Sequence, residues 1–398
     1  MAHNKNNRPT VTDIQDYAIA IPPRADNPQT LDLLLKQMVA IGASDMFLLG
    51  SGEVCVTLYG RVARLTRRRL SDTEVMNLLG IIYNTSAQSL LGAQTPIDTT
   101  YEFYGDPVGD DDEQVIPRYR FRVNAVGCLR AGRNSLTVTM RTIPSAPPHW
   151  EKYGIEKDII EVTSKLVQGL VLMVGGTGHG KSTALASILR ERVEGPGKNT
   201  VMVTIEEPIE FTYDEIDSPS AIISQLQVGL NLKSFYHGVR NSLRMAPKII
   251  LVGEARDFET VQAALSAAMT GHTVFSTVHA NDVASTFQRL VYTYPGNMQN
   301  QAKLDVLQPM ALVMAQRLVP TVDGKRTALR EILKLDQPDK DRLLDAKDLA
   351  SEAFRLLDAH GKPMVASAFE KFKDGIISKD TLKMIELNYS SLKEDLKA

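Results

Sequence analysis

The chain has 398 residues, which at about 150 residues per domain is long enough for two domains and a small third one. Hydrophobic residues make up 43% of it and charged residues 23%, so a globally disordered chain and a small disulfide scaffold are both excluded. A formal net charge of -2 gives no reason to expect a polyanionic partner, and direct nucleic-acid binding is not expected.

The sequence pattern predicts neither a membrane-spanning helix nor a secretory signal. Apolar stretches such as 170–174 are far shorter than the about 20 residues that a membrane-spanning helix needs, so no transmembrane segment is predicted. The first ten residues lack the apolar core of a secretory signal. The two cysteines, Cys55 and Cys128, lie in alternating apolar runs and are expected to be buried thiols in a reducing compartment. We therefore expect a cytoplasmic protein.

The first part of the chain predicts a flexible arm followed by an α+β domain. Residues 1–27 are polar and proline-rich, which is typical of a loosely held N-terminal arm. Residues 28–143 are predicted to form the domain, with a largely antiparallel sheet. A capping box of Ser71 and Glu74 marks the start of its second helix. The expected elements are two helices and strands in four ranges, the first of which holds two strands: helices 30–44 and 74–91; strands 45–65, 99–105, 118–129 and 135–143.

A proline-rich linker is predicted for 144–155, and after it strands alternate with helices. The strands are apolar on both faces, which indicates an α/β domain over 156–335 with a parallel sheet covered by helices on both sides. Residues 336–398 are predicted to form a helical tail. The expected elements of the domain are strands 170–174, 200–205, 248–253 and 273–278, with helices 182–193, 233–246, 260–269 and 284–294.

A phosphate-binding loop is predicted between the strand at 170–174 and the helix that follows it. Glycines let successive backbone N–H groups face a phosphate, and the helix N-terminus adds positive potential. Lys181 is expected to bridge the β- and γ-phosphates of ATP, Ser182 to bind Mg²⁺, and His179 to act only as a spacer. The loop fits the pattern G-x-x-x-x-G-K-[ST] with Gly175, Gly176, Thr177, Gly178, His179, Gly180, Lys181, Ser182 and Thr183.

Acidic residues at two further strand ends are the catalytic candidates. Glu254 follows the strand 248–253, where a carboxylate can orient or deprotonate the attacking water. Glu206 and Glu207 leave the strand 200–205 together, and their repulsion favours a cation between them. Glu207 is therefore expected in the Mg²⁺ shell with Ser182. A solvated turn is the alternative for this pair.

Two histidines flank the strand 273–278. His272 precedes the strand and His279 follows it. Imidazoles at the ends of a central strand can donate to a phosphate and respond to its loss. Both are therefore catalytic candidates, although a lone histidine is more often structural.

Four motifs, in this order and spacing, resemble the secretion ATPase superfamily that powers type II secretion, type IV pili and type IV secretion. GGTGHGKST is similar to its P-loop, TIEEPIEF to its Asp box, ILVGEARDFET to its Walker B element and TGHTVFSTVHAND to its His box. In the first domain, GASDMFLL, RFRVNAVG and TMRTIP resemble strands of the PilT-like branch.

The resemblance implies a PAS-like N-terminal domain, a RecA-like P-loop ATPase domain, and a homo-oligomeric ring, expected to be a hexamer. ATP would lie between the two domains, and arginines of the first domain would reach its phosphates. Cross-strand surface cations are the alternative interpretation of these arginines. The candidates are Arg120, Arg122, Arg133 and Arg141.

The tail differs from that of pilus-retraction ATPases, because DKDRLLDAKDLASEAFRLL stands where they carry an AIRNLI-like motif. This difference favours the DotB/TraJ type of ATPase, which serves type IVB secretion and conjugative transfer. The resemblance then implies a cytoplasmic, hexameric, Mg²⁺-dependent ATPase that converts ATP and water to ADP and phosphate. It would be recruited to the inner membrane by a membrane-bound secretion or conjugation complex.

Three alternatives stay open on the sequence alone. One is a type IV pilus retraction ATPase of the PilT/PilU kind, and another is a nucleotide-gated docking module with negligible turnover. The third is a nucleic-acid translocase, for which the basic run 61–70 is the supporting feature. The other interpretation of that run is a solvated connection between a strand and a helix.

Overall fold

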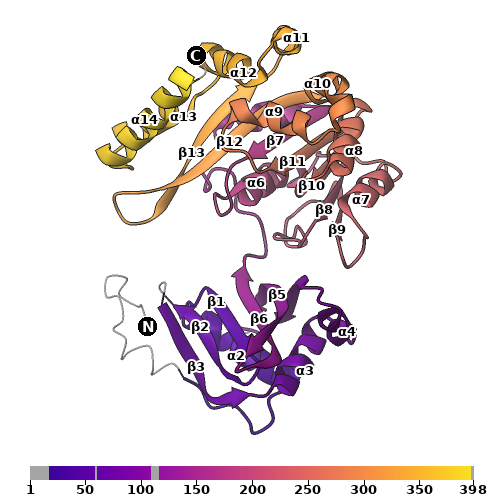
Figure 1. The fold of residues 1–398 in the computed structure, drawn as a ribbon, viewed down its shortest axis with the longest axis vertical. Helices are drawn as coiled ribbons and strands as arrows, with labels where there is room; N and C mark the ends of the chain where they lie inside the picture. The colour runs from indigo at the N-terminus through magenta and orange to yellow at the C-terminus, as the bar shows by residue number, and fades with distance from the viewer. Residues whose placement is uncertain (1–17, 59–60, 109–115, 396–398) are drawn as a thin grey trace. The chain divides into compact units, whose positions relative to one another are not determined.

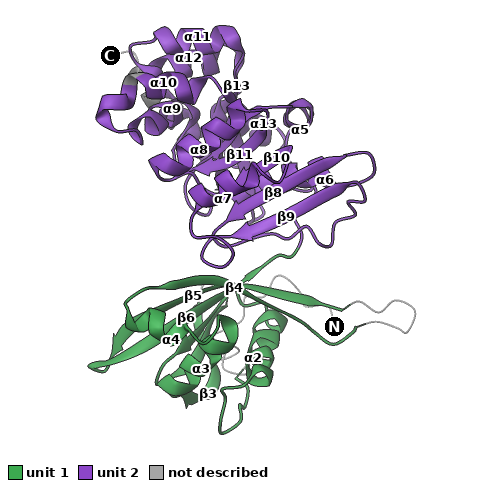
Figure 2. Cartoon of the chain, turned by 90° about the vertical axis from the view of Figure 1, so that its right-hand side faces the viewer, with its two compact units in different colours: residues 1–145 green, residues 146–398 purple. Residues whose placement is uncertain are grey.

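The computed structural model describes residues 18–58, 61–108 and 116–395. The chain divides into two compact units, residues 1–145 and 146–398 (Figure 2). The division falls within the proline-rich range 144–155. Of the helices in the described ranges, none has the length and apolar character to cross a membrane.

The first unit is built on an antiparallel sheet with the strand order β3-β2-β1-β6-β5-β4. Burial alternates along the strands, and the buried face shares one hydrophobic core with the helices. This arrangement confirms the predicted α+β domain. The strands are β1 (Asp45–Leu49), β2 (Gly52–Leu58), β3 (Arg61–Leu70), β4 (Ile97–Tyr104), β5 (Arg118–Arg130) and β6 (Arg133–Ile143); the helices are α2 (Pro28–Ala40), α3 (Asp72–Ile82) and α4 (Ala87–Gly92).

Two details of the first unit differ from the prediction. The basic run 61–70 is strand β3 rather than a connection, because its apolar residues Ala63, Leu65 and Leu70 are buried in the core while most of its arginines stay exposed. The single helix expected at 74–91 is two helices, α3 and α4, separated near Asn84, whose side chain accepts from the backbone N–H of Ser86.

The predicted arm lies partly outside the described residues, which begin at 18. The described part is held on the first unit. The N–H of Ile19 donates to the carbonyl of Leu65 at 2.9 Å, and the N–H of buried Ala25 donates to Glu74 Oε1 at 2.8 Å. Glu74 also completes the predicted capping box with Ser71, which is confirmed.

The second unit contains a mostly parallel sheet with the order β13-β12-β7-β11-β10-β8-β9 (Figure 1). Side chains of β7 alternate between two cores. Leu172 packs with helices α8 (Phe258–Met269) and α9 (Val283–Tyr292), and Met173 packs with helices α5 (Lys157–Lys165) and α6 (Lys181–Val193). Both faces are therefore covered by helices, as predicted. The strands are β7 (Gly169–Val174), β8 (Thr200–Glu206), β9 (Ala221–Gln227), β10 (Ile249–Val252), β11 (Thr273–Val278), β12 (Met310–Pro320) and β13 (Arg326–Lys334).

The helices of this unit connect the parallel strands and cover the sheet. They include the four that periodicity predicts, which are α6, α7, α8 and α9. Their bounds are α5 (Lys157–Lys165), α6 (Lys181–Val193), α7 (Phe235–Ser242), α8 (Phe258–Met269), α9 (Val283–Tyr292) and α10 (Gln299–Leu307), with a short 3₁₀ turn at Gly296–Met298.

Strands β9, β12 and β13 were not expected from the sequence. β12 pairs in parallel with β7, and β13 folds back antiparallel to β12, so this hairpin extends the sheet beyond its parallel part. A short apolar run such as that of β12 has no periodicity that distinguishes a buried strand from a buried helix.

The tail is helical, as predicted, and it belongs to the second unit. Leu356 and Leu357 of α12 join the core that contains α9, while Ile377, Leu382 and Ile385 pack on the β12–β13 hairpin. Figure 1 shows α13 and α14 lying along that hairpin. Part of the apolar face of the tail is thus buried on its own unit, while Phe369, Met384 and Leu387 stay exposed. Its helices are α11 (Gln337–Asp345), α12 (Leu349–His360), α13 (Met364–Lys373) and α14 (Lys379–Asp395).

We expect Glu74→Gln to destabilise the first unit by about 2 kcal/mol at pH 7, because it removes charge-assisted hydrogen bonds. The Arg68 guanidinium, helped by the N–H groups of Ser71 and Ala25 and opposed by burial, lowers the pKa of Glu74 to about 2. A lowered pKa means that this stabilisation is complete above the ordinary value of 4.5 and is lost as the pH falls towards 2. Thermal unfolding should therefore show a difference between the two proteins that shrinks from pH 7 to pH 3. An equal difference at both pH values would contradict this account.

Candidate nucleotide-binding site

Four parallel strands end at one edge of the sheet in the second unit, and each carries a predicted site residue there. The phosphate-binding loop follows β7, Glu206 ends β8, Glu254 lies two residues after β10, and His279 directly follows β11. The register places Val174 beside Val278, and Val252 beside both Ile205 and Ser276. Parallel strands present their carboxyl ends together, so residues more than 100 positions apart in the sequence meet at this edge.

Lys181 lies at the start of α6 with its ammonium group turned back onto the loop. Its Nζ donates to the carbonyl oxygens of Gly175 at 2.8 Å and Gly176 at 3.0 Å. Burial lowers the pKa of Lys181, although the charges of Glu254 and Glu210 oppose that shift. The ammonium is therefore held inside the loop by weak acceptors, which a phosphate group can replace.

His179 is more than the spacer that the sequence suggests. Its Nδ1 accepts from the N–H of Leu318 at 3.0 Å, and its carbonyl accepts from Gln316 Nε2 at 2.7 Å. Both partners come from β12, a strand that the sequence did not predict. The loop is therefore attached to the neighbouring strand at this residue.

Glu254 lies among basic side chains. Its carboxylate forms an ion pair with Arg256 at 2.6 Å, and His279 Nε2 lies 3.2 Å from Glu254 Oε1. Burial would raise its pKa, but Arg256, His279 and Lys181 together hold that pKa below its ordinary value. Glu254 is therefore a carboxylate at neutral pH, which is the state that a water-activating group needs.

The acidic pair at the end of β8 divides into two environments. Glu206 Oε1 accepts from Thr204 Oγ1 at 2.8 Å, whereas Glu207 is exposed. Burial of the carboxyl group, together with the charge of Glu210, raises the pKa of Glu206 to about 7. Of the two, Glu207 is the one open to a cation in solvent.

The structure does not bring His272 to this edge. Its carbonyl accepts from the N–H of Gly169 and its Nδ1 lies 3.0 Å from the carbonyl of Ala267, at the amino-terminal end of β11. A six-residue strand, about 20 Å long, separates it from His279. The prediction that groups the two histidines at one site is therefore corrected, and His279 alone stays with the site.

The four candidate arginines of the first unit lie on the β5–β6 hairpin. Arg120 is buried, pairs with Glu102 at 3.1 Å and donates to the carbonyl of Pro144. Arg122 is opposite Arg141, which pairs with Asp45 at 2.6 Å. Arg133 lies at the other end of the hairpin, beside the turn. Strand geometry therefore separates Arg133 from the other three.

Polar and charged side chains that were not predicted from the sequence lie beside the predicted site residues. Arg256 stands two residues after Glu254 in the same motif, and that spacing alone could have suggested the ion pair. A cavity of about 310 Å³ next to the loop is lined in part by Asn281, Ser285 and Arg289. Ser285 and Arg289 are four residues apart on α9 and so share one helix face, which is the only sequence signal that connects them.

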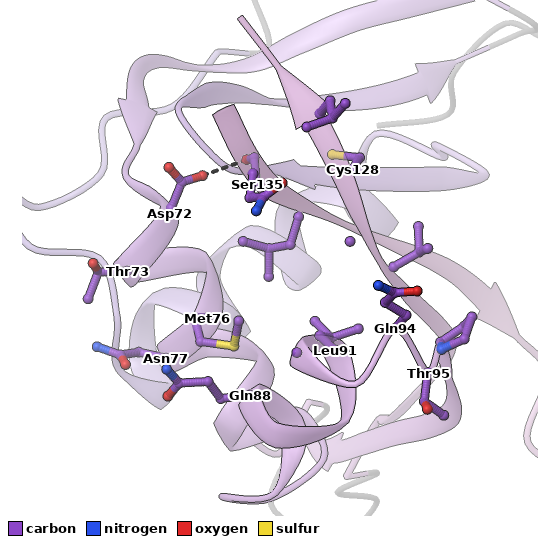
Figure 3. Close-up of a pocket in the computed structure, with 17 residues that line it drawn as sticks. Asp72, Thr73, Met76, Asn77, Gln88, Leu91, Gln94, Thr95, Cys128 and Ser135 are labelled. Atoms are coloured by element: carbon purple, nitrogen blue, oxygen red, sulfur yellow. Dashed lines mark hydrogen bonds between the residues drawn. The ribbon is translucent and has the colours of Figure 1, made fainter. Parts of the chain in front are cut away.

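A second cavity of about 820 Å³ lies in the first unit, between α3, α4 and the β5–β6 hairpin (Figure 3). Its lining is mostly apolar and amide side chains, and its carboxylate, Asp72, accepts from Ser135 Oγ at 2.5 Å. None of the predicted site residues lines it.

The sequence profile of the type II/IV secretion system protein family matches residues 30–380. The chain belongs to this family. It is therefore a P-loop ATPase.

This ATPase is similar in sequence or structure to three known ATPases. The type IV pilus ATPase PilU of Pseudomonas aeruginosa is 30% identical over 343 residues, which cover 85% of this chain and 80% of PilU. The crystal structure of the Legionella pneumophila ATPase DotB superposes with a TM-score of 0.85 at 40% identity, covering 93% of this chain and 98% of DotB. The pilus retraction motor PilT with bound ADP gives a TM-score of 0.73 at 28% identity, covering 88% of this chain and 95% of that one.

We expect Lys181→Ala to abolish nucleotide binding and hydrolysis, since the ammonium stabilises phosphate charge throughout the reaction. Glu254→Gln should keep nucleotide affinity within a few-fold and lower turnover about 10²- to 10⁴-fold, the usual contribution of a positioned general base. Nucleotide titration and phosphate release measure the two quantities. Glu194→Gln is the matched control, because Glu194 pairs with Arg190 at the far end of α6. Wild-type turnover in the Glu254→Gln protein would rule out this role.

Proposed function

We propose that this ATPase is a motor of the DotB/TraJ type, which serves a type IVB secretion or conjugative transfer machine. The observation that carries the proposal is the likeness to DotB. It reaches 40% identity across 93% of the chain for the Legionella DotB, against 29% for the Yersinia DotB, 28% for the PilT structure and 30% for PilU. The absence of the retraction-type motif after residue 335 supports the same assignment.

The proposed reaction is hydrolysis of ATP to ADP and phosphate with Mg²⁺. Ser182 and Glu207 offer hard oxygen ligands, and among the described residues no group of three His, Cys, Asp or Glu side chains could hold a metal ion. This donor set suits Mg²⁺, which binds through one or two protein oxygens together with phosphates and water. The bound ion would neutralise phosphate charge. Glu254 would take the proton of the attacking water, and His279 and Arg256 would hold that carboxylate in place.

The proposed motor acts as a homo-hexamer recruited to the cytoplasmic face of the inner membrane. A closed ring needs a heterologous interface, in which each subunit presents two different surfaces to its neighbours. Within such a ring, arginines of the first unit would reach the phosphates of a nucleotide.

Pilus retraction is the second candidate, because PilU is similar over 85% of the chain. In the protein's own host, Glu254→Gln in place of the wild-type copy should end transfer of DNA or effector proteins while pilus retraction continues. Transfer frequency and twitching motility are the two measurements, and Glu194→Gln is the control. Lost twitching with intact transfer would favour retraction instead.

The arginine hypothesis makes a separate prediction. Arg122→Ala and Arg141→Ala should each lower phosphate release at least about tenfold, since an arginine placed against the transferring phosphate contributes on the order of 10³ to 10⁵ in rate. Arg133→Ala is the matched control, because Arg133 lies at the opposite end of the same hairpin. Equal rates in all three variants and the wild type would exclude the hypothesis.

A further inference from the structure

We propose that Tyr153, Gln316 and Arg330 position the phosphate-binding loop from the side away from the nucleotide. These three residues are called the loop brace below. The proposal rests on nucleotide binding at the P-loop, and it adds residues that lie outside the family motifs in the sequence. It makes affinity for phosphate depend on side chains that do not themselves bind it.

Arg330 is the centre of the loop brace. It is only 1% exposed and stands on β13 directly opposite Gln316 on β12. Its Nε donates to Gln316 Oε1 at 2.8 Å. Its Nη atoms donate to the carbonyls of Tyr153 and Gly154 and to Glu156 Oε2, and its guanidinium lies 5.8 Å from the centre of the Tyr153 ring. One side chain therefore fixes both Gln316 and the segment 153–156.

The other two residues connect this centre to the phosphate-binding loop. Gln316 Nε2 donates to the carbonyl of His179 at 2.7 Å. The Tyr153 hydroxyl donates to the carbonyl of Gly180 at 3.1 Å. Two successive carbonyls of the loop thus accept from the brace, and that of Gly180 also accepts from the N–H of Ala184 at 3.0 Å.

The orientation of these carbonyls determines which way the loop's N–H groups point. In a trans peptide the C=O and N–H bonds point in opposite directions. The carbonyl of His179 shares its peptide plane with the N–H of Gly180, and the carbonyl of Gly180 shares one with the N–H of Lys181. When the brace draws both carbonyls to one side, both N–H groups point to the other side, which is where such loops bind phosphate.

The packing around Gly180 supports this arrangement. Its φ is +76°, and a Cβ atom there would lie 2.2 Å from the Tyr153 hydroxyl and 3.1 Å from Gln316 Nε2. The glycine therefore permits the close approach of the brace as well as the backbone turn. The brace and the loop are packed as one unit.

A buried arginine is costly unless its donors are paired, and a well-packed apolar residue would often stabilise the fold at least as well. The planar guanidinium provides what an apolar residue cannot, since its donors reach an amide, backbone carbonyls and a carboxylate together. The segment 153–156 lies near the start of the second unit, which begins at Ala146. The loop brace therefore connects the chain arriving from the first unit to the phosphate-binding loop.

Tyr153→Phe tests the proposal with little structural disturbance, because it removes one hydroxyl. We expect the dissociation constants of ADP and of inorganic pyrophosphate to rise by the same factor, about 3- to 10-fold, the value of one neutral hydrogen bond. Gln316→Met should have an effect of at least that size. Tyr389→Phe is the matched control, since it removes a 2.6 Å hydrogen bond to Asp358 within the tail.

Arg330→Lys tests whether Arg330 connects Gln316 and the segment 153–156 to the phosphate-binding loop. Lysine keeps the positive charge beside Glu156 but cannot reach Gln316 and the carbonyls at once, so both ligands should bind about 3- to 10-fold more weakly. Arg192→Lys is the matched control, because Arg192 donates to the carbonyls of Thr163 and Leu166 from the last turn of α6, at the opposite end of the helix from the loop.

A merely structural role would lower the melting temperature of the ligand-free variants and leave both dissociation constants unchanged, and that result overturns the proposal. If Arg330→Lys does not fold, Tyr153→Phe and Gln316→Met decide the question. Failure of the wild-type protein to bind ADP would overturn the nucleotide site and the brace together. Normal binding by the wild type with unchanged constants in the variants would overturn the brace alone.

Discussion

The central strands of the second unit carry apolar side chains on both faces, and the arrangement of the site depends on this constraint. Leu172 and Met173 of β7 point into different cores, so helices must cover both sides of the sheet. Helices α6, α8 and α9 lie in the connections from β7 to β8, from β10 to β11 and from β11 to β12, and the strands β7, β8, β10 and β11 run parallel. Charged residues have no place within such strands. They are confined to the strand ends, and the carboxyl ends of β7, β8, β10 and β11 gather them at one edge.

The same constraint explains which site residues the sequence could reveal. Lys181 and Glu254 are recognisable because each follows an apolar strand, and a strand end is visible as a change from apolar to polar residues. His272 shows the same change, yet it lies at the amino-terminal end of β11. Polarity marks both ends of a buried strand alike, so it cannot tell which end joins the site. That distinction comes from the strand direction: the sheet is parallel here, so His272, which precedes β11, lies at the edge opposite to the carboxyl ends.

Contacts between elements far apart in the chain could not be predicted from the sequence, for a related reason. The partners of His179 come from β12, which is about 140 positions further along the chain. The apolar run of β12 does not by itself predict a strand. The pairing of Gln316 with Arg330 follows only from the register of β12 and β13, which the sequence pattern does not give. Local signals were sufficient for Ser71 and Glu74, since both partners of a capping box lie within four residues.

The charged groups at the site have partners within the protein. Lys181 donates to loop carbonyls, while Glu254 is paired with Arg256 and His279. A phosphate that enters must replace the carbonyls as the partner of Lys181, which is favourable because an anion is a stronger acceptor than a neutral carbonyl. The loop, by contrast, must not rearrange when the ammonium leaves those carbonyls. Hydrogen bonds from Tyr153 and Gln316 to the carbonyls of Gly180 and His179 are independent of Lys181, so they can maintain the direction of the N–H groups through that exchange.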